Sequence, residues 1–175
     1  HLLVRDGTLF WDGLPSMVNT LLCHRVVPEG RSIPALMFLG FMLRVESTPT
    51  RSPSTTRGVI GNTFLAFTNE SGRAQRGQLG VVFGGMEGRY RLSLGQSSNV
   101  TDEDVLPLEL MAGEEVRVVV AYDTVRQVAT IWVNPTGRAD EPPLRSTGAG
   151  STVRLHSLGV RMHNRGMQDL GTLRL

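Results

Sequence analysis

Apolar positions along this chain recur with a period of two, which indicates strands rather than helices. Residues 116–122 form a nearly continuous β-branched run, as expected of a buried strand. Residues 125–133 follow with alternating side chains, and Tyr122-Asp123-Thr124 forms a short connection between the two runs. The pattern therefore predicts a β-hairpin in this part of the chain.

Further strand-like runs are separated at short intervals by Gly, Pro, Ser and Asn. They are residues 8–11, 17–27, 36–45, 59–60 with 64–67, 79–83, 90–94, 153–162 and 170–175. We expect residues 36–45 to be buried on much of both faces. Many short strands divided by such turns predict an all-β sandwich or barrel.

Helix and loop signals are few. Residues 102–110 carry the pattern of one short helical turn, with Thr101 as N-cap and Asp104 at the third helical position. Residues 47–57, which are rich in Ser, Thr and Pro, and residues 134–151 are predicted to be flexible loops. We therefore expect little or no helix.

The order of segments from residue 38 to residue 175 resembles that of a known family. It includes Leu39-Gly40-Phe41-Met42-Leu43-Arg44-Val45-Glu46, Val118-Val119-Val120-Ala121-Tyr122-Asp123, Ala129-Thr130-Ile131-Trp132-Val133-Asn134-Pro135 and Gly171-Thr172-Leu173-Arg174-Leu175. This order is similar to that of the laminin-G-like, concanavalin-like domains of exported planctomycete- and verrucomicrobium-type bacterial proteins. The resemblance implies a two-sheet antiparallel jelly-roll sandwich, with one domain over residues 1–175 and a weaker match over residues 1–35.

The most specific part of the resemblance is the valine run ending in Tyr122-Asp123, followed by the strand that ends in Trp132-Val133-Asn134-Pro135. In such a sandwich Trp132 buries most of its ring. Asn134 and Pro135 end the strand, because proline cannot donate to the ladder. Asp123 is expected at the tight turn, where it accepts hydrogen bonds from neighbouring backbone amides.

Composition narrows the chemistry. The 175 residues include 18 basic residues, all of them arginine, and 16 acids, so the formal net charge is only +2. The absence of lysine excludes lysine Schiff bases and P-loop lysines. The arginines are dispersed among acids, which disfavours nucleic-acid binding. The lone Cys23, in an apolar run, is interpreted as a small buried residue.

Catalytic patterns are missing from the sequence. Hydrolases of the concanavalin-like fold often carry Glu-x-Asp-x-x-Glu on one strand, so that the carboxylates face the cleft. This chain has no such spacing, and neither His156 nor His163 has glutamine two positions before it, as lyases of the fold tend to have. We therefore predict a protein that is not an enzyme.

Two ligand hypotheses remain. Asp102, Glu103 and Asp104 could supply oxygen ligands to calcium, although the favoured interpretation is a solvated acidic loop or a helix N-terminus stabilised by its dipole. The histidines show no zinc spacing. For glycan binding, Trp11 and Tyr90 are the aromatic residues that the predicted strands leave freest.

We expect a structural or accessory subunit that docks onto a larger periplasmic, membrane-surface or extracellular assembly, since arginine and aromatic residues favour protein interfaces. The alternative is a carbohydrate-binding module of an exported protein. The most apolar stretch, residues 33–45, is too short to span a membrane. The given chain begins at His1 without a basic signal-peptide segment, so we expect a mature or trimmed product.

Overall fold

The structure is a computed structural model that describes residues 2–5, 8–11, 20–25, 27–46, 48, 62–69, 71, 75–83, 86–95, 104–137, 144–147, 154–162 and 173–174. Its strands are β1 (Leu2–Arg5), β2 (Thr8–Trp11), β3 (Thr20–Arg25), β4 (Leu36–Val45), β5 (Asn62–Thr68), β6 (Gln75–Phe83), β7 (Arg89–Gly95), β8 (Leu110–Met111), β9 (Glu115–Asp123), β10 (Val128–Val133), β11 (Leu144–Thr147), β12 (Ser157–Met162) and β13 (Leu173–Arg174).

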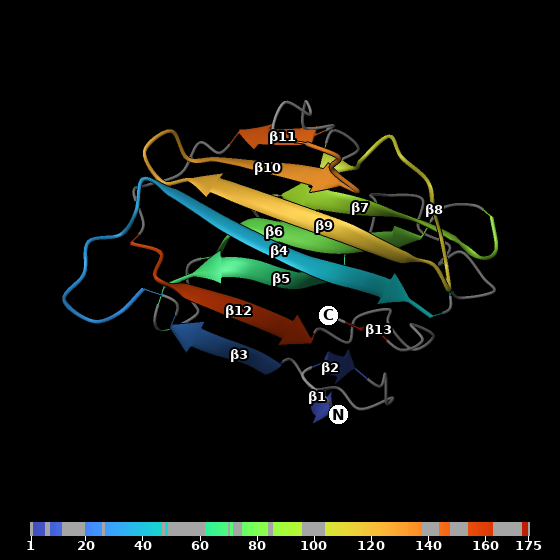
Figure 1. The fold of residues 1–175 in the computed structure, drawn as a ribbon, viewed down its shortest axis with the longest axis horizontal. Coiled ribbons are helices and arrows are strands. Elements are labelled where there is room, and N and C mark those ends of the chain that lie inside the picture. Colours follow the sequence, from blue (N-terminus) through green and yellow to red (C-terminus); the bar gives the residue numbers. More distant parts are fainter. Residues whose placement is uncertain are drawn as a thin grey trace.

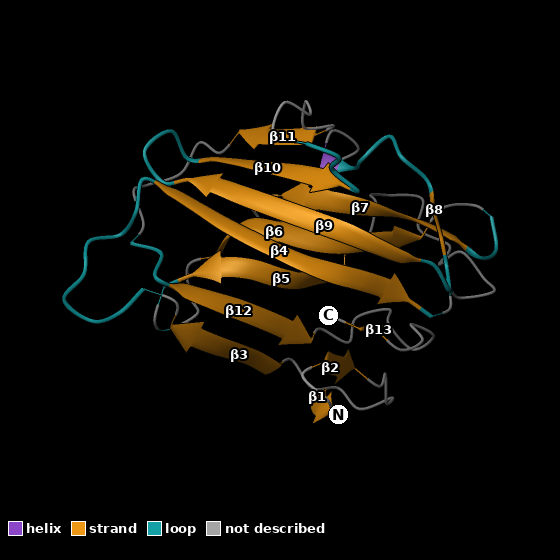
Figure 2. Cartoon of the chain, viewed as in Figure 1, coloured by secondary structure: helices purple, strands orange, loops and turns teal. Residues whose placement is uncertain are grey.

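These strands form two sheets that lie face to face (Figure 1). The seven-stranded sheet has the order β1-β2-β13-β4-β9-β10-β11, and the six-stranded sheet has the order β3-β12-β5-β6-β7-β8. Neighbouring strands are antiparallel throughout. Strands dominate the described residues (Figure 2). The predicted all-β, two-sheet antiparallel sandwich is confirmed, whereas its jelly-roll connectivity stays a prediction.

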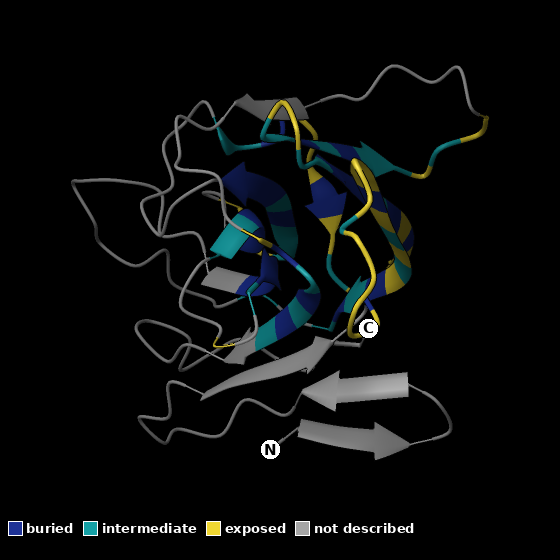
Figure 3. Cartoon of the chain, turned by 90° about the vertical axis from the view of Figure 1, so that its left-hand side faces the viewer, coloured by how far each residue is buried: buried dark blue, intermediate teal, exposed yellow. Residues whose placement is uncertain are grey.

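The core lies between the two sheets, where buried residues gather (Figure 3). In β9 every second side chain points inward, and Val116, Val118 and Val120 are almost completely buried. This period of two is the signal that the sequence carries, because successive side chains of a strand point to opposite faces. Burial of such side chains is the main favourable contribution to folding.

Two aromatic pairs connect the sheets through the core. Phe41 of β4 meets Phe64 of β5 edge to face, with ring centroids 6.4 Å apart and planes at 90°. Phe67 of β5 lies 5.8 Å from Tyr122 of β9, with the rings tilted by 37°. Each pair joins a strand of one sheet to a strand of the other, so these ring contacts fix how the two sheets pack on each other.

Gly77 allows the sheets to approach closely. It lies in β6 with φ +56°, where the β5–β6 ladder shifts register. A Cβ at this position would lie 3.3 Å from both the Ala129 Cβ and the Phe67 Cδ2. Only glycine adopts this backbone conformation without penalty and also leaves room for the facing strand β10.

The sequence predicted several strand limits correctly and others wrongly. The limits of β2 and β4 agree with the prediction, and the expected pairing of β6 with β7 is present. Strand β10, however, begins at Val128 rather than Val125, because residues 124–127 form a four-residue turn. Residues 144–147, expected within a flexible loop, pair with β10 as edge strand β11.

The short helical turn predicted for residues 102–110 is present only at its start in the described part: Asp104 lies in a 3-10 turn, and the chain is no longer helical from Val105 onward. The Leu106 amide donates to the Leu92 carbonyl oxygen at 2.7 Å, and Val105 forms an antiparallel bridge with Ser93. Leu106 is fully buried. Pairing with β7 and burial of this leucine therefore end the helical turn after Asp104, as tertiary contacts commonly override local helix signals.

We expect Gly77→Ala to lower the free energy of unfolding by about 1–3 kcal/mol, because it adds both backbone strain and crowding. Two control variants separate these causes. Gly113→Ala also has positive φ, +85°, but has open space around its Cβ, and Gly137→Ala has neither problem. In urea denaturation, the loss of stability should be largest for Gly77→Ala, smaller for Gly113→Ala and smallest for Gly137→Ala. Equal midpoints for Gly77→Ala and Gly113→Ala would show that the crowding is unimportant.

Candidate functional site on the outer face of β4, β9 and β10

Tyr90, predicted to be a free aromatic, is fully buried. It lies in β7 and points into the core, and its hydroxyl has no hydrogen-bond partner among the described residues. Burial, with a smaller contribution from the charge of Glu114, raises the pKa of Tyr90 from its ordinary value of 10.0 to about 12. The prediction that Tyr90 offers an exposed surface to a ligand is therefore wrong.

The other predicted ligand residues fall mainly outside the described side chains. The backbone of Trp11 belongs to β2, but its side chain lies outside the described part. Asp102 and Glu103 also lie outside the described residues, and Asp104 is half-buried. Within the described ranges no three His, Cys, Asp or Glu side chains gather as a metal-ligand set. Calcium binding by these acids stays a prediction.

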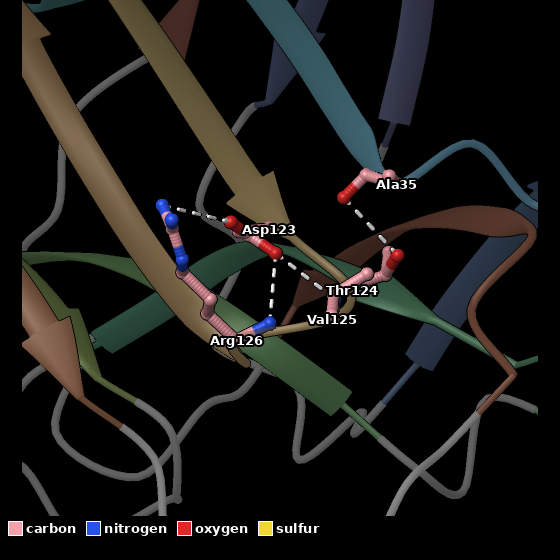
Figure 4. Close-up of polar contacts among 5 residues, drawn as sticks. All are labelled: Ala35, Asp123, Thr124, Val125 and Arg126. Atoms are coloured by element: carbon pink, nitrogen blue, oxygen red, sulfur yellow. Dashed lines mark hydrogen bonds and ion pairs between the residues drawn. The ribbon is translucent and has the colours of Figure 1, made fainter.

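Asp123 holds the turn between β9 and β10, as predicted (Figure 4). Its Oδ1 accepts hydrogen bonds from the amides of Val125 at 2.9 Å and Arg126 at 2.8 Å. Its Oδ2 lies 3.8 Å from Nη1 of Arg126, whose side chain is 83% exposed. Gln127, with φ +58°, completes the turn in the left-handed region. The carboxylate therefore has a structural function here.

Thr124 connects this turn to the segment that leads into β4 (Figure 4). Its amide donates to the Ala35 carbonyl oxygen at 2.8 Å. Its hydroxyl lies 3.0 Å from the Pro34 carbonyl oxygen and 3.1 Å from that of Ala35, so it can donate to either. The turn after β9 is therefore fixed to the residue before β4.

Asn134 ends β10 by pairing with Arg117 of β9 through its backbone amide and its side chain, in place of a further regular pair of backbone hydrogen bonds. Its amide donates to the Arg117 carbonyl oxygen at 2.7 Å, and its side-chain Oδ1 accepts from the Arg117 amide at 2.8 Å. The left-handed backbone, with φ +49°, turns the chain away, and Pro135 follows. The predicted strand end is confirmed, and the structure shows that asparagine supplies both hydrogen bonds.

The outer face of β4 exposes large apolar side chains. Leu36, Phe38 and Met42 are 46%, 63% and 44% exposed, whereas alternate residues such as Met37 and Leu43 are buried. Exposed and buried bands alternate along this sheet in Figure 3. The expectation that residues 36–45 are buried on both faces is therefore wrong for one face.

The apolar surface continues across β9 onto β10. In the register, Gly40 of β4 lies opposite Val119 of β9, and Val119 lies opposite Trp132 of β10. Val119 and Trp132 are both partly buried on this face, whereas their neighbour Ile131 points into the core. We call Leu36, Phe38, Met42, Val119 and Trp132 the outer apolar patch.

Charged residues border the patch at its Met42 end. Arg44 lies opposite Glu115 in the register, and its Nε forms an ion pair with Glu46 at 3.1 Å. Arg117 lies opposite Met42 and is exposed. An apolar centre bordered by charged residues is the composition typical of a protein interface.

Sequence reasoning placed Trp132 on the correct strand but missed the patch. Runs such as Leu36 to Val45 are apolar at nearly every position, so the period alone does not distinguish an exposed apolar face from a buried one. The one available signal is the pair Gly40 and Arg44, both on the outward set of positions, which a fully buried strand would seldom contain.

Comparisons with known proteins do not assign a family. No protein-family model matches the chain, and no curated protein matches its sequence. The laminin-G-like resemblance therefore stays a prediction that rests on the sequence motifs. Among the described residues, no helix has the length and apolar character needed to cross a membrane.

We expect Asp123→Ala to lower the free energy of unfolding by about 1 kcal/mol, because two backbone amides lose their acceptor. Asp123→Asn should lose less stability than Asp123→Ala, because it retains a side-chain oxygen that can accept hydrogen bonds. The matched control Arg126→Ala should change stability by under about 0.5 kcal/mol, because that ion pair is exposed to solvent. Chemical denaturation measures all three, and a larger loss for Arg126→Ala would contradict the assignment to the amide hydrogen bonds.

Tyr90→Phe should leave stability at neutral pH unchanged or slightly higher, because the buried hydroxyl that it removes has no partner in the described part of the chain. The pKa of Tyr90 is near 12 in the folded protein and 10.0 when unperturbed, so the unfolded chain loses this proton first. Stability of the wild type should therefore fall as pH rises from about 10 to about 12. Chemical denaturation at increasing pH should show that the free energy of unfolding falls less steeply for Tyr90→Phe than for the wild type. An equal fall in both proteins would contradict the assignment of this pH dependence to Tyr90.

Proposed function

We propose that the protein is a non-catalytic structural or accessory subunit that docks onto a larger assembly through the outer apolar patch. The assembly is proposed to be periplasmic, at a membrane surface or extracellular, in keeping with the resemblance to exported domains. The occupant of the patch is a protein partner with its own apolar surface. Trp132 and Phe38 would supply its aromatic anchors, and Arg117 would supply a polar contact at its edge.

The observation that supports this proposal is the exposure of Phe38 between Leu36 and Met42 on one sheet face. Single exposed apolar residues are ordinary, but neighbouring large ones on a flat face mark interaction sites. The backbone beneath them belongs to β4, which pairs with β9 over nine residues. The patch therefore lies on a rigid support, and a partner would not have to order it on binding.

The chemistry of the face favours docking over catalysis. Of the carboxylates bordering it, that of Asp123 accepts two backbone amides, that of Glu46 pairs with Arg44, and Glu115 lies opposite Arg44 in the register. The sequence has no Glu-x-Asp-x-x-Glu pattern that would place a nucleophile and an acid together on one strand. These features support a protein that binds and does not transform its partner.

Carbohydrate binding is the second candidate function. It is favoured by one observation, that Phe38 and Trp132 lie on the same sheet face as Thr130. Asn134 follows directly at the end of β10 and adds a second polar side chain nearby. Aromatic side chains beside hydrogen-bonding groups form platforms for sugar rings. This proposal replaces Tyr90 with Phe38 and Trp132 as the aromatic residues of a glycan site.

We expect Phe38→Ser to weaken partner binding by about 2 kcal/mol, roughly thirtyfold in Kd, because it removes an aromatic anchor. The matched control is Met86→Ser, which changes a 54% exposed side chain at the β6–β7 turn in the other sheet. The tagged chain is purified under native conditions from its source cells, and the mass of the complex gives the stoichiometry of the partner. Affinities are then measured with the isolated partner.

The outcomes distinguish the two functions. A partner at fixed stoichiometry, lost with Phe38→Ser and retained with Met86→Ser, supports docking. Binding to a glycan array that falls for Phe38→Ser, with no stoichiometric protein partner, favours the carbohydrate-binding module and contradicts docking. Partner binding that is equal in both variants places the interface elsewhere and contradicts the role of the patch.

A further inference from the structure

A pocket of about 440 Å³ opens at the end of the sandwich where β4 begins and β9 ends. Its walls come from the loop before β4 and from the segment before β12, at the left of Figure 1. The lining residues are Val27, Pro28, Gly30, Arg31, Ser32, Ile33, Arg154 and His156. None of them belongs to the outer apolar patch, so this pocket is a separate feature of the molecule.

The polar lining of the pocket is cationic. Arg31 comes from one wall and Arg154 from the other, and His156 lies two residues after Arg154. None of the described residues that line the pocket is acidic, although Glu29 is an exposed neighbour in the same loop. No ion pair or hydrogen bond within the described part of the chain occupies either guanidinium. Both groups therefore keep their donors available for a ligand.

His156 is held in place by its neighbours. Its amide donates to the Thr68 carbonyl oxygen at 3.1 Å, and its carbonyl oxygen accepts from the Val27 amide at 3.0 Å. Its ring Nδ1 lies 3.1 Å from Oγ of the buried Ser157. When the Ser157 hydroxyl donates to Nδ1, the neutral ring carries its proton on Nε2 as a further donor.

We propose that this pocket binds an oxyanion group, namely a carboxylate, sulfate or phosphate. Arginine suits these groups because its planar guanidinium presents paired N–H donors at the spacing of their oxygens. Two arginines from separate segments, with no carboxylate among the described lining residues, would contact one such group from two sides. The apolar wall from Val27, Pro28 and Ile33 leaves room for the rest of a ligand that carries the anion.

The test follows backbone amide NMR signals during titration with sodium sulfate or sodium acetate at constant ionic strength. We expect saturable shifts at Gly30, Ser32 and His156. The double variant Arg31→Gln/Arg154→Gln should bind at least about tenfold more weakly, because charge-assisted hydrogen bonds are lost. The matched control Arg126→Gln changes an exposed arginine at the same end, outside the pocket, and should bind as the wild type does.

Both arginines are exposed, so the variants should fold, and unchanged signals from β9 check that they do. If the double variant shifts its β9 signals, the two single variants replace it in the same titration. Linear shifts that do not saturate, or equal affinities of the double variant and the control, would overturn the proposal. A sulfated monosaccharide that binds more tightly than inorganic sulfate identifies an anionic group on a larger ligand; equal binding identifies a site for the free anion.

Discussion

The antiparallel pairing of β4 with β9 is the constraint on which the rest of the structure depends. Its register runs without interruption from Leu36 opposite Asp123 to Arg44 opposite Glu115. Because side chains alternate between faces, this register determines at once which residues form the core and which face outward. A slip of β9 by one residue against β4 would expose Val118 and bury charged Arg117. The aromatic pairs to β5 are possible only in the observed register.

The same constraint explains how a strand rich in apolar residues produces both a core and an interaction surface. The inward set of β4 packs against the second sheet, and the outward set has no covering layer among the described residues. A sandwich needs only one apolar face on each sheet. The second apolar face of β4, β9 and β10 is therefore not required by the sandwich architecture, which is why we propose it as a binding surface. The structure thus connects a local excess of hydrophobicity to the proposed docking function.

Much of this fold could be predicted from the sequence, because period-two patterns and turn residues act locally. The limits of β4 and the hydrogen-bonding role of Asp123 followed from such signals. Burial of Tyr90 did not, because it depends on which face of β7 meets the other sheet. The pocket is also beyond local reasoning, since Arg31 and Arg154 are brought together only by the fold.

The hydrogen bonds made by Thr124 have a consequence for the loop that lines the pocket. That loop is tied at its start, where the Val27 amide donates to His156, and just after its end, where Ala35 accepts from Thr124. A loop held at both ends has already lost much of its conformational freedom during folding. The backbone of this loop is therefore restrained before any ligand arrives, and one of the two restraints comes from a hairpin that does not itself line the pocket.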